Sequence, residues 1–184
     1  MIERITDLVK KILINEKNIK LAVDMTAGNG NDSFFIIDEL NPKKLVAFDI
    51  QKSAKENTES LLGPRDNFTF ILDSHENIDS YIKEPIDLAI YNLGYLPNGD
   101  KSITTLSEST LLSLKKLLTL LRKGGKVCLS LYPGHDQGRI EAEKIETFIK
   151  SLPPKDYAIL KLNFPNKGTS APYIIIIEKK SRVI

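Results

Sequence analysis

The chain has 184 residues, of which 41% are hydrophobic and 27% are charged, and its formal net charge is +2. This length suits one domain with its own hydrophobic core, and the composition is ordinary for a soluble globular protein. No apolar run approaches the roughly 20 residues that span a bilayer, so the sequence predicts no transmembrane helix. A net charge so near neutrality neither demands nor excludes a nucleic-acid partner.

Cysteine and histidine are scarce: Cys128 is the one cysteine, and His75 and His135 are the two histidines. An intrachain disulfide, a thiolate zinc cluster and an all-histidine zinc site are therefore excluded, and we expect no metal. Residues 1–15 mix charges into their apolar positions, which predicts an amphipathic helix and not a secretory signal. We expect a single domain over residues 1–184, located in the cytoplasm and without membrane contact.

Short β-rich blocks alternate with longer helical stretches, which is typical of βαβ units around a mostly parallel sheet. In chain order we expect a helix over 1–15, a strand over 20–25, a helix over 31–40, a strand over 44–49, a helix over 53–62, strands over 68–72 and 87–91, a helix over 107–122, a turn over 123–125, a strand over 126–131, a helix over 139–151, and strands over 157–164 and 172–179.

Only the seven residues 165–171 separate the last two expected strands, which is too few for a parallel crossover, so this pair should be antiparallel. The predicted fold class is α/β, with a seven-stranded, mostly parallel sheet, an antiparallel C-terminal hairpin and helices on both faces. This layout differs from the six-parallel-strand dinucleotide-binding pattern. It resembles the Rossmann-like fold of class I methyltransferases.

The first expected strand leads into a loop of small and acidic residues, Asp24 to Asp32. Gly28 and Gly30 allow a ligand to approach the backbone where the strand turns into a helix. The nicotinamide fingerprint requires a third Gly or Ala, but Ser33 stands at that position, and no Arg or Lys follows to hold a pyrophosphate. The loop instead suits S-adenosylmethionine, which has no phosphate and presents an ammonium, a sulfonium and a ribose diol.

We therefore assign this loop and the ends of the next strands to S-adenosylmethionine as the cofactor. Asp24 and Asp32 are expected at its methionine end, and Asp49, about 20 residues past the loop, should bind the ribose hydroxyls, although it could also cap the next helix. Residues 73–75 are expected near the adenine, or they form a simple turn. The expected cofactor-binding residues are Asp24, Thr26, Gly28, Asn29, Gly30, Asn31, Asp32, Asp49, Gln51, Asp73, Ser74, His75, Asn92 and Gly94.

Residues 92–97, Asn-Leu-Gly-Tyr-Leu-Pro, follow the fourth expected strand at the sheet edge where open α/β folds bind ligands. The carbonyl oxygen of Asn92 can accept an N–H bond from an amine and leave the amine lone pair directed at a methyl group. Tyr95 can stack on a base. The segment resembles the Asn-Pro-Pro-Tyr loop of amino-methyltransferases with Leu-Gly in place of the prolines; the alternative is a β-turn with a surface aromatic.

Three segments together resemble the small YtqB-type family of methyltransferases, first described as rRNA methylases: DMTAGNGND, YNLGYLPNGDK and LYPGHDQGRIEAE. The resemblance extends over nearly the whole chain. It implies a class I enzyme with the MnmM activity, which methylates the aminomethyl group of 5-aminomethyl-2-thiouridine at the wobble position of tRNA. The implied partner is the anticodon stem-loop of tRNA.

A second distinctive loop, residues 132–138, follows the fifth long strand and opens onto the same crevice. Tyr132 is expected to stack on the uridine, and His135 to accept a proton from a substrate ammonium, because imidazole exchanges protons near neutral pH. The alternative is that His135 bonds to the backbone of its loop. The expected catalytic residues are Asn92, Tyr95 and His135; the expected substrate-binding residues are Tyr95, Leu96, Pro97, Tyr132, His135 and, as a phosphate contact, Lys167.

The residues alone leave other functions open. An rRNA or small-molecule N-methyltransferase would keep every cofactor residue, whereas a nicotinamide-dependent oxidoreductase would need pyrophosphate contacts. A non-catalytic nucleic-acid-binding module is suggested by basic pairs such as Lys43-Lys44 and Lys115-Lys116, although such pairs are more often solvated helix ends. The leucine-rich helix or the edge of the terminal hairpin is expected to support a homodimer.

Overall fold

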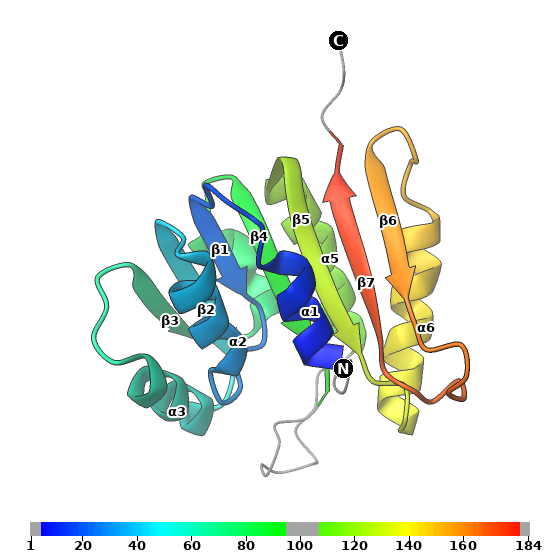
Figure 1. Cartoon of the computed structure of the whole chain (residues 1–184), viewed down its shortest axis with the longest axis horizontal. Helices are drawn as coiled ribbons and strands as arrows, with labels where there is room; N and C mark the ends of the chain where they lie inside the picture. Colours follow the sequence, from blue (N-terminus) through cyan, green and yellow to red (C-terminus); the bar gives the residue numbers. More distant parts are fainter. Residues whose placement is uncertain (1–4, 95–106, 181–184) are drawn as a thin grey trace.

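The computed structural model describes residues 5–94 and 107–180. In this part of the chain seven strands form one sheet in the order β3-β2-β1-β4-β5-β7-β6 (Figure 1). They are β1 Leu21–Asp24, β2 Lys44–Asp49, β3 Phe68–Leu72, β4 Ile86–Asn92, β5 Leu121–Leu131, β6 Tyr157–Leu162 and β7 Tyr173–Lys179. The first five strands are parallel, and β7 pairs antiparallel with both β5 and β6. The predicted fold class is confirmed, including its antiparallel hairpin.

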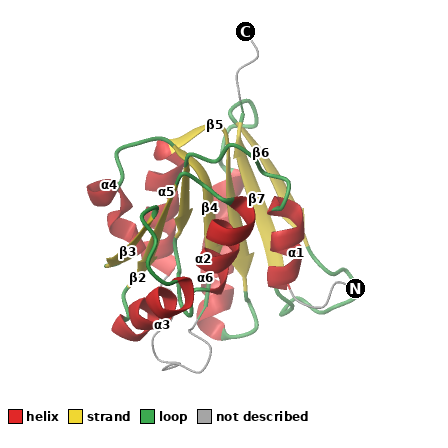
Figure 2. Cartoon of the chain, turned by 60° about the vertical axis from the view of Figure 1, so that its left-hand side comes forward, coloured by secondary structure: helices red, strands yellow, loops and turns green. Residues whose placement is uncertain are grey.

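Helices cover both faces of this sheet (Figure 2). One face carries α1 Ile5–Leu13, α2 Asn31–Phe35 with its π-helical continuation η1 Ile36–Leu40, and α3 Lys52–Leu62. The other carries the 3₁₀ turn η2 His75–Asn77, α4 Ile78–Tyr81, α5 Ser107–Leu120 and α6 Asp136–Lys150. No helix in the described ranges is both long and apolar enough to cross a membrane.

Alternation along the strands builds a separate core on each face. In β2, Leu45 belongs to the core on the face of α1 and α2, whereas Val46 and Phe48 belong to the core on the face of α4 and α5, because successive side chains of a strand point to opposite faces. All three side chains are at most 3% exposed. The Phe48 ring meets the Tyr81 ring of α4 edge-on at 5.8 Å. The central parallel strands β1, β2 and β4, which are covered on both faces, are therefore apolar at most positions, and their observed bounds lie within one residue of the predicted ones.

Two local predictions were wrong. Residues 123–125 were predicted as a turn before a strand, but β5 includes them: Leu121 pairs with Ile86 and Lys126 pairs with Leu88, so the intervening residues form a bulge. Gly124 has a φ of 75° at this bulge. The last long helix begins at Asp136 and not at 139, because His135 caps it.

Asp87 ties together the amino ends of β1, β4 and β5. Its Oδ2 accepts hydrogen bonds from the backbone nitrogens of Lys20 and Leu21, both at 2.8 Å, and its Oδ1 pairs with Arg122. The Asp87 side chain is 5% exposed. A buried donor without an acceptor has lost its bonds to water and makes no bond in the protein, which lowers stability. We therefore expect the fold to depend strongly on this carboxylate.

We predict that Asp87→Ala lowers the free energy of unfolding by about 3 kcal/mol, because two backbone donors and a guanidinium lose their common acceptor. Urea denaturation followed by circular dichroism measures the change. Asp66→Ala, which removes an exposed carboxylate, is the matched control and should shift the free energy by less than about 0.5 kcal/mol. Equal losses in the two variants would contradict the role given to Asp87.

Candidate active site

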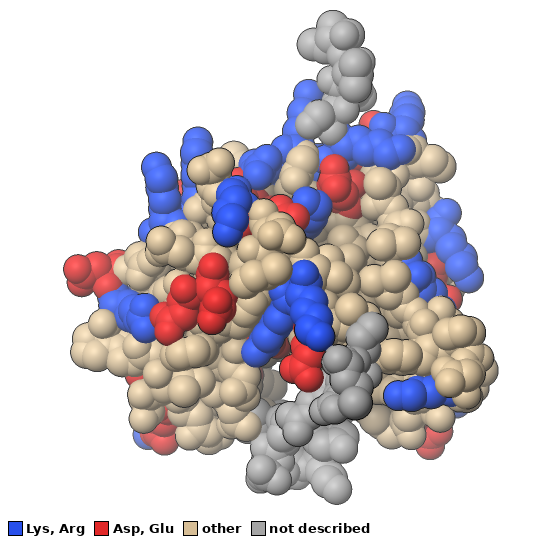
Figure 3. All heavy atoms as spheres, in the orientation of Figure 1, with Lys and Arg blue, Asp and Glu red and all other residues tan. Residues whose placement is uncertain are grey.

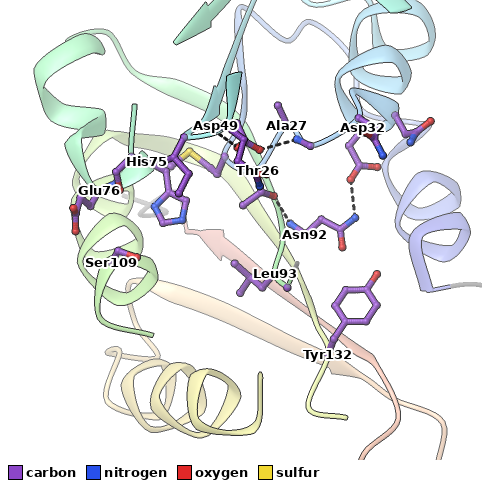
Figure 4. A pocket seen from close by; sticks show the side chains of 18 of the residues that line it. Thr26, Ala27, Asp32, Asp49, His75, Glu76, Asn92, Leu93, Ser109 and Tyr132 are labelled. Carbon is purple, nitrogen blue, oxygen red and sulfur yellow. Dashed lines mark hydrogen bonds between the residues drawn. The ribbon is translucent and has the colours of Figure 1, made fainter. Parts of the chain in front are cut away.

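A cavity of about 750 Å³ lies at the carboxyl ends of the parallel strands (Figure 4). This is the edge at which open α/β sheets bind ligands. The walls come from the loops after β1 to β5 and from the β6–β7 turn. The lining residues are Met25, Thr26, Ala27, Gly28, Asn29, Asn31, Asp32, Asp49, Ile50, Gln51, Asp73, Ser74, His75, Glu76, Asn92, Leu93, Gly94, Ser109, Tyr132, Gly134, His135, Ser170 and Pro172.

Most of the residues assigned to the site from the sequence meet in this cavity. Those that line it are Thr26, Gly28, Asn29, Asn31, Asp32, Asp49, Gln51, Asp73, Ser74, His75, Asn92, Gly94, Tyr132 and His135. Asp24, Gly30 and Lys167 are not among the lining residues. Tyr95, Leu96 and Pro97 lie outside the described residues.

Sequence reasoning missed several lining residues, including Ile50, Glu76 and Ser109. A sequence signal marks Ile50, because it is a large apolar residue directly after the acidic end of a strand. In the structure its side chain is 59% exposed. Glu76 follows His75 in a short 3₁₀ turn that no periodicity reveals. Ser109 reaches the cavity only through the packing of α5, and no local pattern marks it.

Asp49 fastens the loop after β1 to the end of β2. Its Oδ2 accepts a hydrogen bond from the backbone nitrogen of Gly28 and its Oδ1 accepts one from the backbone nitrogen of Gln51, both at 2.9 Å. The backbone nitrogen of Ala27 adds a bond to the carbonyl oxygen of Phe48, also at 2.9 Å. A carboxylate has about four acceptor positions, so Asp49 keeps acceptor capacity for a ligand in the cavity.

Gly30 allows the loop to lie directly against α3. Its φ is +81°, and a Cβ at this position would lie 2.9 Å from the Cα of Thr58 in α3. Both the backbone conformation and the space therefore require glycine. The close approach of α3 sets where α2 begins, and with it the positions of Asn31 and Asp32.

Asp24 is fully buried at the end of β1 and contacts the loop from inside the protein. Its Oδ1 accepts a hydrogen bond from the backbone nitrogen of Thr26 at 3.1 Å, and its Oδ2 accepts one from Ser33 Oγ at 2.6 Å. Burial, and next the charge of Asp32, raise the pKa of Asp24 from 3.8 to about 7. The contacts indicate that Asp24 shapes the loop; its assignment to the cofactor stays a prediction.

We predict that Asp24→Asn makes the unfolding free energy of the ligand-free protein less dependent on pH between about 4 and 7. In the wild type the folded state keeps the Asp24 proton over this range while the unfolded state loses it, so the folded state binds more protons and stability falls as pH rises. Asparagine keeps an oxygen for Thr26 and has no such proton.

Urea titrations at about pH 5 and about pH 8 measure this difference, which should be smaller in Asp24→Asn than in the wild type. Asp38→Asn is the matched control, because Asp38 lies in η1, the continuation of α2, and pairs with Arg65 on the surface. The control should keep the wild-type slope. A wild-type slope in Asp24→Asn would mean that Asp24 is ionised in the folded state throughout.

Asp32 and Asn92 meet at the methionine side of the expected site (Figure 4). Asn92 Nδ2 donates to Asp32 Oδ2 at 3.3 Å, and the Asn92 backbone nitrogen donates to Thr26 Oγ1 at 2.8 Å. Burial raises the pKa of Asp32, and the nearby charge of Lys10 opposes this shift. The two strand ends β1 and β4 are thus joined through polar side chains that face the cavity.

Asp73 and His75 line the part of the cavity that follows β3. Asp73 accepts hydrogen bonds from the Tyr81 hydroxyl at 2.8 Å and from the backbone nitrogen of Ser74 at 2.7 Å, and these hold its pKa below the ordinary value. Burial lowers the pKa of His75 to about 4, so its ring is neutral at neutral pH. The His75 ring meets the ring of Tyr91 edge-on at 5.9 Å.

His135 lines the cavity and also caps α6. Its Nδ1 accepts a hydrogen bond from the backbone nitrogen of Gly138 at 3.1 Å, which agrees with the alternative of a backbone-bonded histidine. A proton placed on Nδ1 would break this cap. Burial, and next the charge of Asp32, raise the pKa of Tyr132 to about 12, so its hydroxyl stays protonated at neutral pH.

The charge of the cavity is one-sided. Asp32, Asp49, Asp73 and Glu76 line it, whereas none of its lining residues in the described ranges is Lys or Arg. Unlike charges attract strongly where water is partly excluded, so this lining favours a cationic ligand and disfavours a pyrophosphate. Within the same ranges, no group of three or more His, Cys, Asp and Glu side chains could hold a metal ion.

A family model described as "Putative rRNA methylase" matches residues 45–178 of the chain. The chain belongs to this family. The resemblance predicted from three sequence segments is thereby confirmed. The chain is also 35% identical over 172 residues to an Arabidopsis thaliana protein named tRNA (mnm(5)s(2)U34)-methyltransferase, chloroplastic. That match covers 86% of the chain but 62% of the plant protein, so the chain spans less than two thirds of this relative.

Solved structures resemble the chain over nearly its whole length. A "putative rRNA-methylase" from Clostridium thermocellum has a TM-score of 0.90 and 34% identity, with 97% of this chain and 99% of that chain covered. A Streptococcus mutans protein crystallised in complex with SAH has a TM-score of 0.86 and 34% identity, with the same coverage. At these identities the likeness extends beyond the general fold that many methyltransferases share.

Proposed function

We propose that this chain is an S-adenosylmethionine-dependent N-methyltransferase whose cofactor binds in the cavity at the carboxyl edge of the sheet. The observation that carries the proposal is the lining of carboxylates without Lys or Arg in the described residues. S-adenosylmethionine carries an ammonium and a sulfonium, so it fits this lining. A nicotinamide dinucleotide fits poorly, because its pyrophosphate would face Asp32 and Asp49, and no Lys or Arg is among the described lining residues.

The similar Streptococcus mutans protein supports the same proposal, since SAH is the demethylated form of this cofactor. Asp32, with Thr26, Asn29 and Asn31, would hold the methionine end; Asp49 and Gln51 would hold the ribose; and Asp73, Ser74 and His75 would lie around the adenine. Gly28 and Gly94 would complete the wall of the site beside Asp49 and Tyr132. Asp24 and Gly30 would act from behind by holding the loop in place.

S-adenosylmethionine supplies a methyl group that its sulfonium has already activated. The chain then has to orient an amine and keep water away from it. Asn92 suits the first task, because its carbonyl oxygen can accept an N–H bond and so direct the amine lone pair. Tyr132 and His135 border the same space, and we propose that they contact the nucleoside that carries the amine.

We further propose tRNA as the substrate, at the aminomethyl group of 5-aminomethyl-2-thiouridine in the anticodon stem-loop. The name of the plant relative supports this substrate. Basic side chains support a nucleic acid in general: Lys10 and Lys11 lie in the last turn of α1. Figure 3 shows further Lys and Arg side chains on the face of the molecule that carries α1. Lys167, the proposed phosphate contact, lies in the β6–β7 turn, where its Nζ is 4.4 Å from the ring centre of Phe164.

Labelled S-adenosylmethionine and tRNA test both parts of the proposal. The chain should transfer label to tRNA that carries 5-aminomethyl-2-thiouridine, and mass spectrometry of the nucleosides should find the methylaminomethyl form. tRNA with an unmodified wobble uridine is the control and should stay unlabelled. Label in rRNA alone, the substrate class in the family description, would overturn the tRNA assignment and leave the cofactor assignment standing.

Other expectations stay predictions. We propose one domain over residues 1–184, a cytoplasmic location, and roles for Tyr95, Leu96 and Pro97 in binding the base. A homodimer is also proposed, since β6 is an edge strand with Ile159 and Leu160 at 38% and 52% exposure. Sedimentation velocity tests it: a single species of 20.7 kDa across concentrations would exclude the dimer.

A further inference from the structure

The Asn92 side chain has two ends with opposite hydrogen-bonding character. Its carbonyl oxygen only accepts, and its amino group only donates. A substrate amine needs an acceptor for its N–H group, so only the carbonyl oxygen can direct the lone pair toward a methyl group. A half-turn of the amide would present the amino group in its place. The proposed reaction therefore requires that one of the two orientations be fixed.

The structure holds Asn92 at two points, one on its backbone and one on its side-chain amide. The backbone nitrogen donates to Thr26 Oγ1 at 2.8 Å, which fixes the end of β4 against the loop after β1. The amino nitrogen donates to Asp32 Oδ2 at 3.3 Å. Because Asp32 Oδ2 is the acceptor of this bond, the amino group of Asn92 faces Asp32 and the carbonyl oxygen faces away from it. Figure 4 shows the carbonyl oxygen of Asn92 pointing away from Asp32, toward the side where Tyr132 lies.

Lys10 places a positive charge near Asp32. Its Nζ lies 3.5 Å from the carbonyl oxygen of Asn31 and 5.5 Å from the centre of the Phe35 ring, so the ammonium is held next to the first turn of α2. Burial raises the pKa of Asp32, and the charge of Lys10 opposes this rise. Lys10 thus acts on Asp32 through its charge, and Asp32 accepts a hydrogen bond from the amino group of Asn92. The carbonyl oxygen of Asn92 is left directed at the cavity.

We propose that Asp32 is a positioning residue for methyl transfer, which holds the Asn92 amide with its carbonyl oxygen toward the substrate amine. The inference rests on the proposed function. In that reaction the amine nitrogen forms a bond to the methyl carbon as the carbon–sulfur bond breaks, the electron pair of that bond stays on sulfur, and the product ammonium releases a proton to water. Asp32 acts on this step only through Asn92.

Asp32→Asn is the decisive variant. The charge of Lys10 attracts the carbonyl oxygen of the new amide, whose amino group then faces Asn92 and draws the Asn92 carbonyl oxygen away from the substrate. We expect kcat at saturating cofactor and tRNA to fall about tenfold. Asp38→Asn removes a carboxylate further along the same helical segment and should leave kcat unchanged.

The same substitution in an Asn92→Ser background separates the explanations. A serine hydroxyl can accept an N–H bond whatever stands at position 32, so Asp32→Asn should change kcat less than about twofold there. A tenfold loss in both backgrounds would overturn the proposal, because Asp32 would then act apart from Asn92. A raised Kd for SAH with unchanged kcat would also overturn it, because Asp32 would then be a cofactor contact alone.

A readout without turnover completes the test. The side-chain amide signals of Asn92 in a nitrogen–proton NMR spectrum are identified by their loss in Asn92→Ser. They should shift in Asp32→Asn of the ligand-free protein and stay in place in Asp38→Asn. Unshifted signals in Asp32→Asn would overturn the inferred orientation. A wild type that binds SAH but methylates no tRNA would refute the proposed substrate, while the NMR result would still decide the orientation.

Discussion

Replacing Asp49 with alanine is expected to weaken the binding of SAH about a hundredfold, the largest loss of affinity that we predict for a single residue. Asp49 lines the cavity and, on the proposed function, accepts hydrogen bonds from the two ribose hydroxyls. Bonds to a charged acceptor contribute about 1.5 kcal/mol or more each, and two such bonds correspond to about a hundredfold in Kd. Isothermal titration calorimetry with SAH measures the change without any need for turnover.

Asp49 also holds the backbone nitrogens of Gly28 and Gln51, so part of the loss could come from the loop. Asp49→Asn separates the two effects, because its remaining oxygen can accept one backbone bond while the carboxylate charge is gone. We expect an intermediate loss for Asp49→Asn and none for Asp66→Ala, whose carboxylate is exposed on the surface. Wild-type affinity in Asp49→Ala would refute the ribose assignment.

The fold could be predicted from the sequence because its main signals are local. The strands β2 and β3 have the predicted bounds, since each is a short apolar run between polar breaks. The antiparallel end of the sheet followed from the number of residues between the last strands, a limit of chain geometry. These features need no knowledge of distant contacts.

The missed features depend on contacts that local patterns do not contain. The helix α6 begins at Asp136 because His135 Nδ1 accepts a bond from Gly138, and histidine is not among the usual capping residues. The bulge at Gly124 depends on how β5 pairs with β4. Between β3 and β4, η2 and α4 are too short for helical periodicity to show.

The site also has features that local sequence patterns predict and features that depend on distant contacts. Strand ends predicted which residues would gather, and Asp32, Asp49 and Asn92 do line one cavity. Their neighbours decide how each one acts. Asp24 has the same chemistry as Asp32 but is bonded to Ser33 and Thr26 inside the protein, and only the packing of α2 against β1 determines that difference.

Asn92 combines a structural contact of its backbone with a proposed catalytic contact of its side chain, and alanine separates them. The bond from the Asn92 backbone nitrogen to Thr26 Oγ1 does not involve the side chain, so Asn92→Ala keeps the contact that joins β4 to the loop after β1. The carbonyl oxygen that would direct the substrate amine is lost. The variant therefore separates orientation of the amine from assembly of the site.

We predict that Asn92→Ala lowers kcat about a hundredfold or more while the Kd for SAH changes less than about threefold, because loss of one fixed polar group at a reacting centre costs about this much. Single-turnover kinetics with tRNA bearing 5-aminomethyl-2-thiouridine and calorimetry with SAH measure the two values. Asn67→Ala, which removes an amide bonded to the Pro42 carbonyl oxygen away from the cavity, should keep both. A large loss of SAH affinity with little loss of kcat would show that Asn92 serves the cofactor and leave the substrate amine to be oriented by another group.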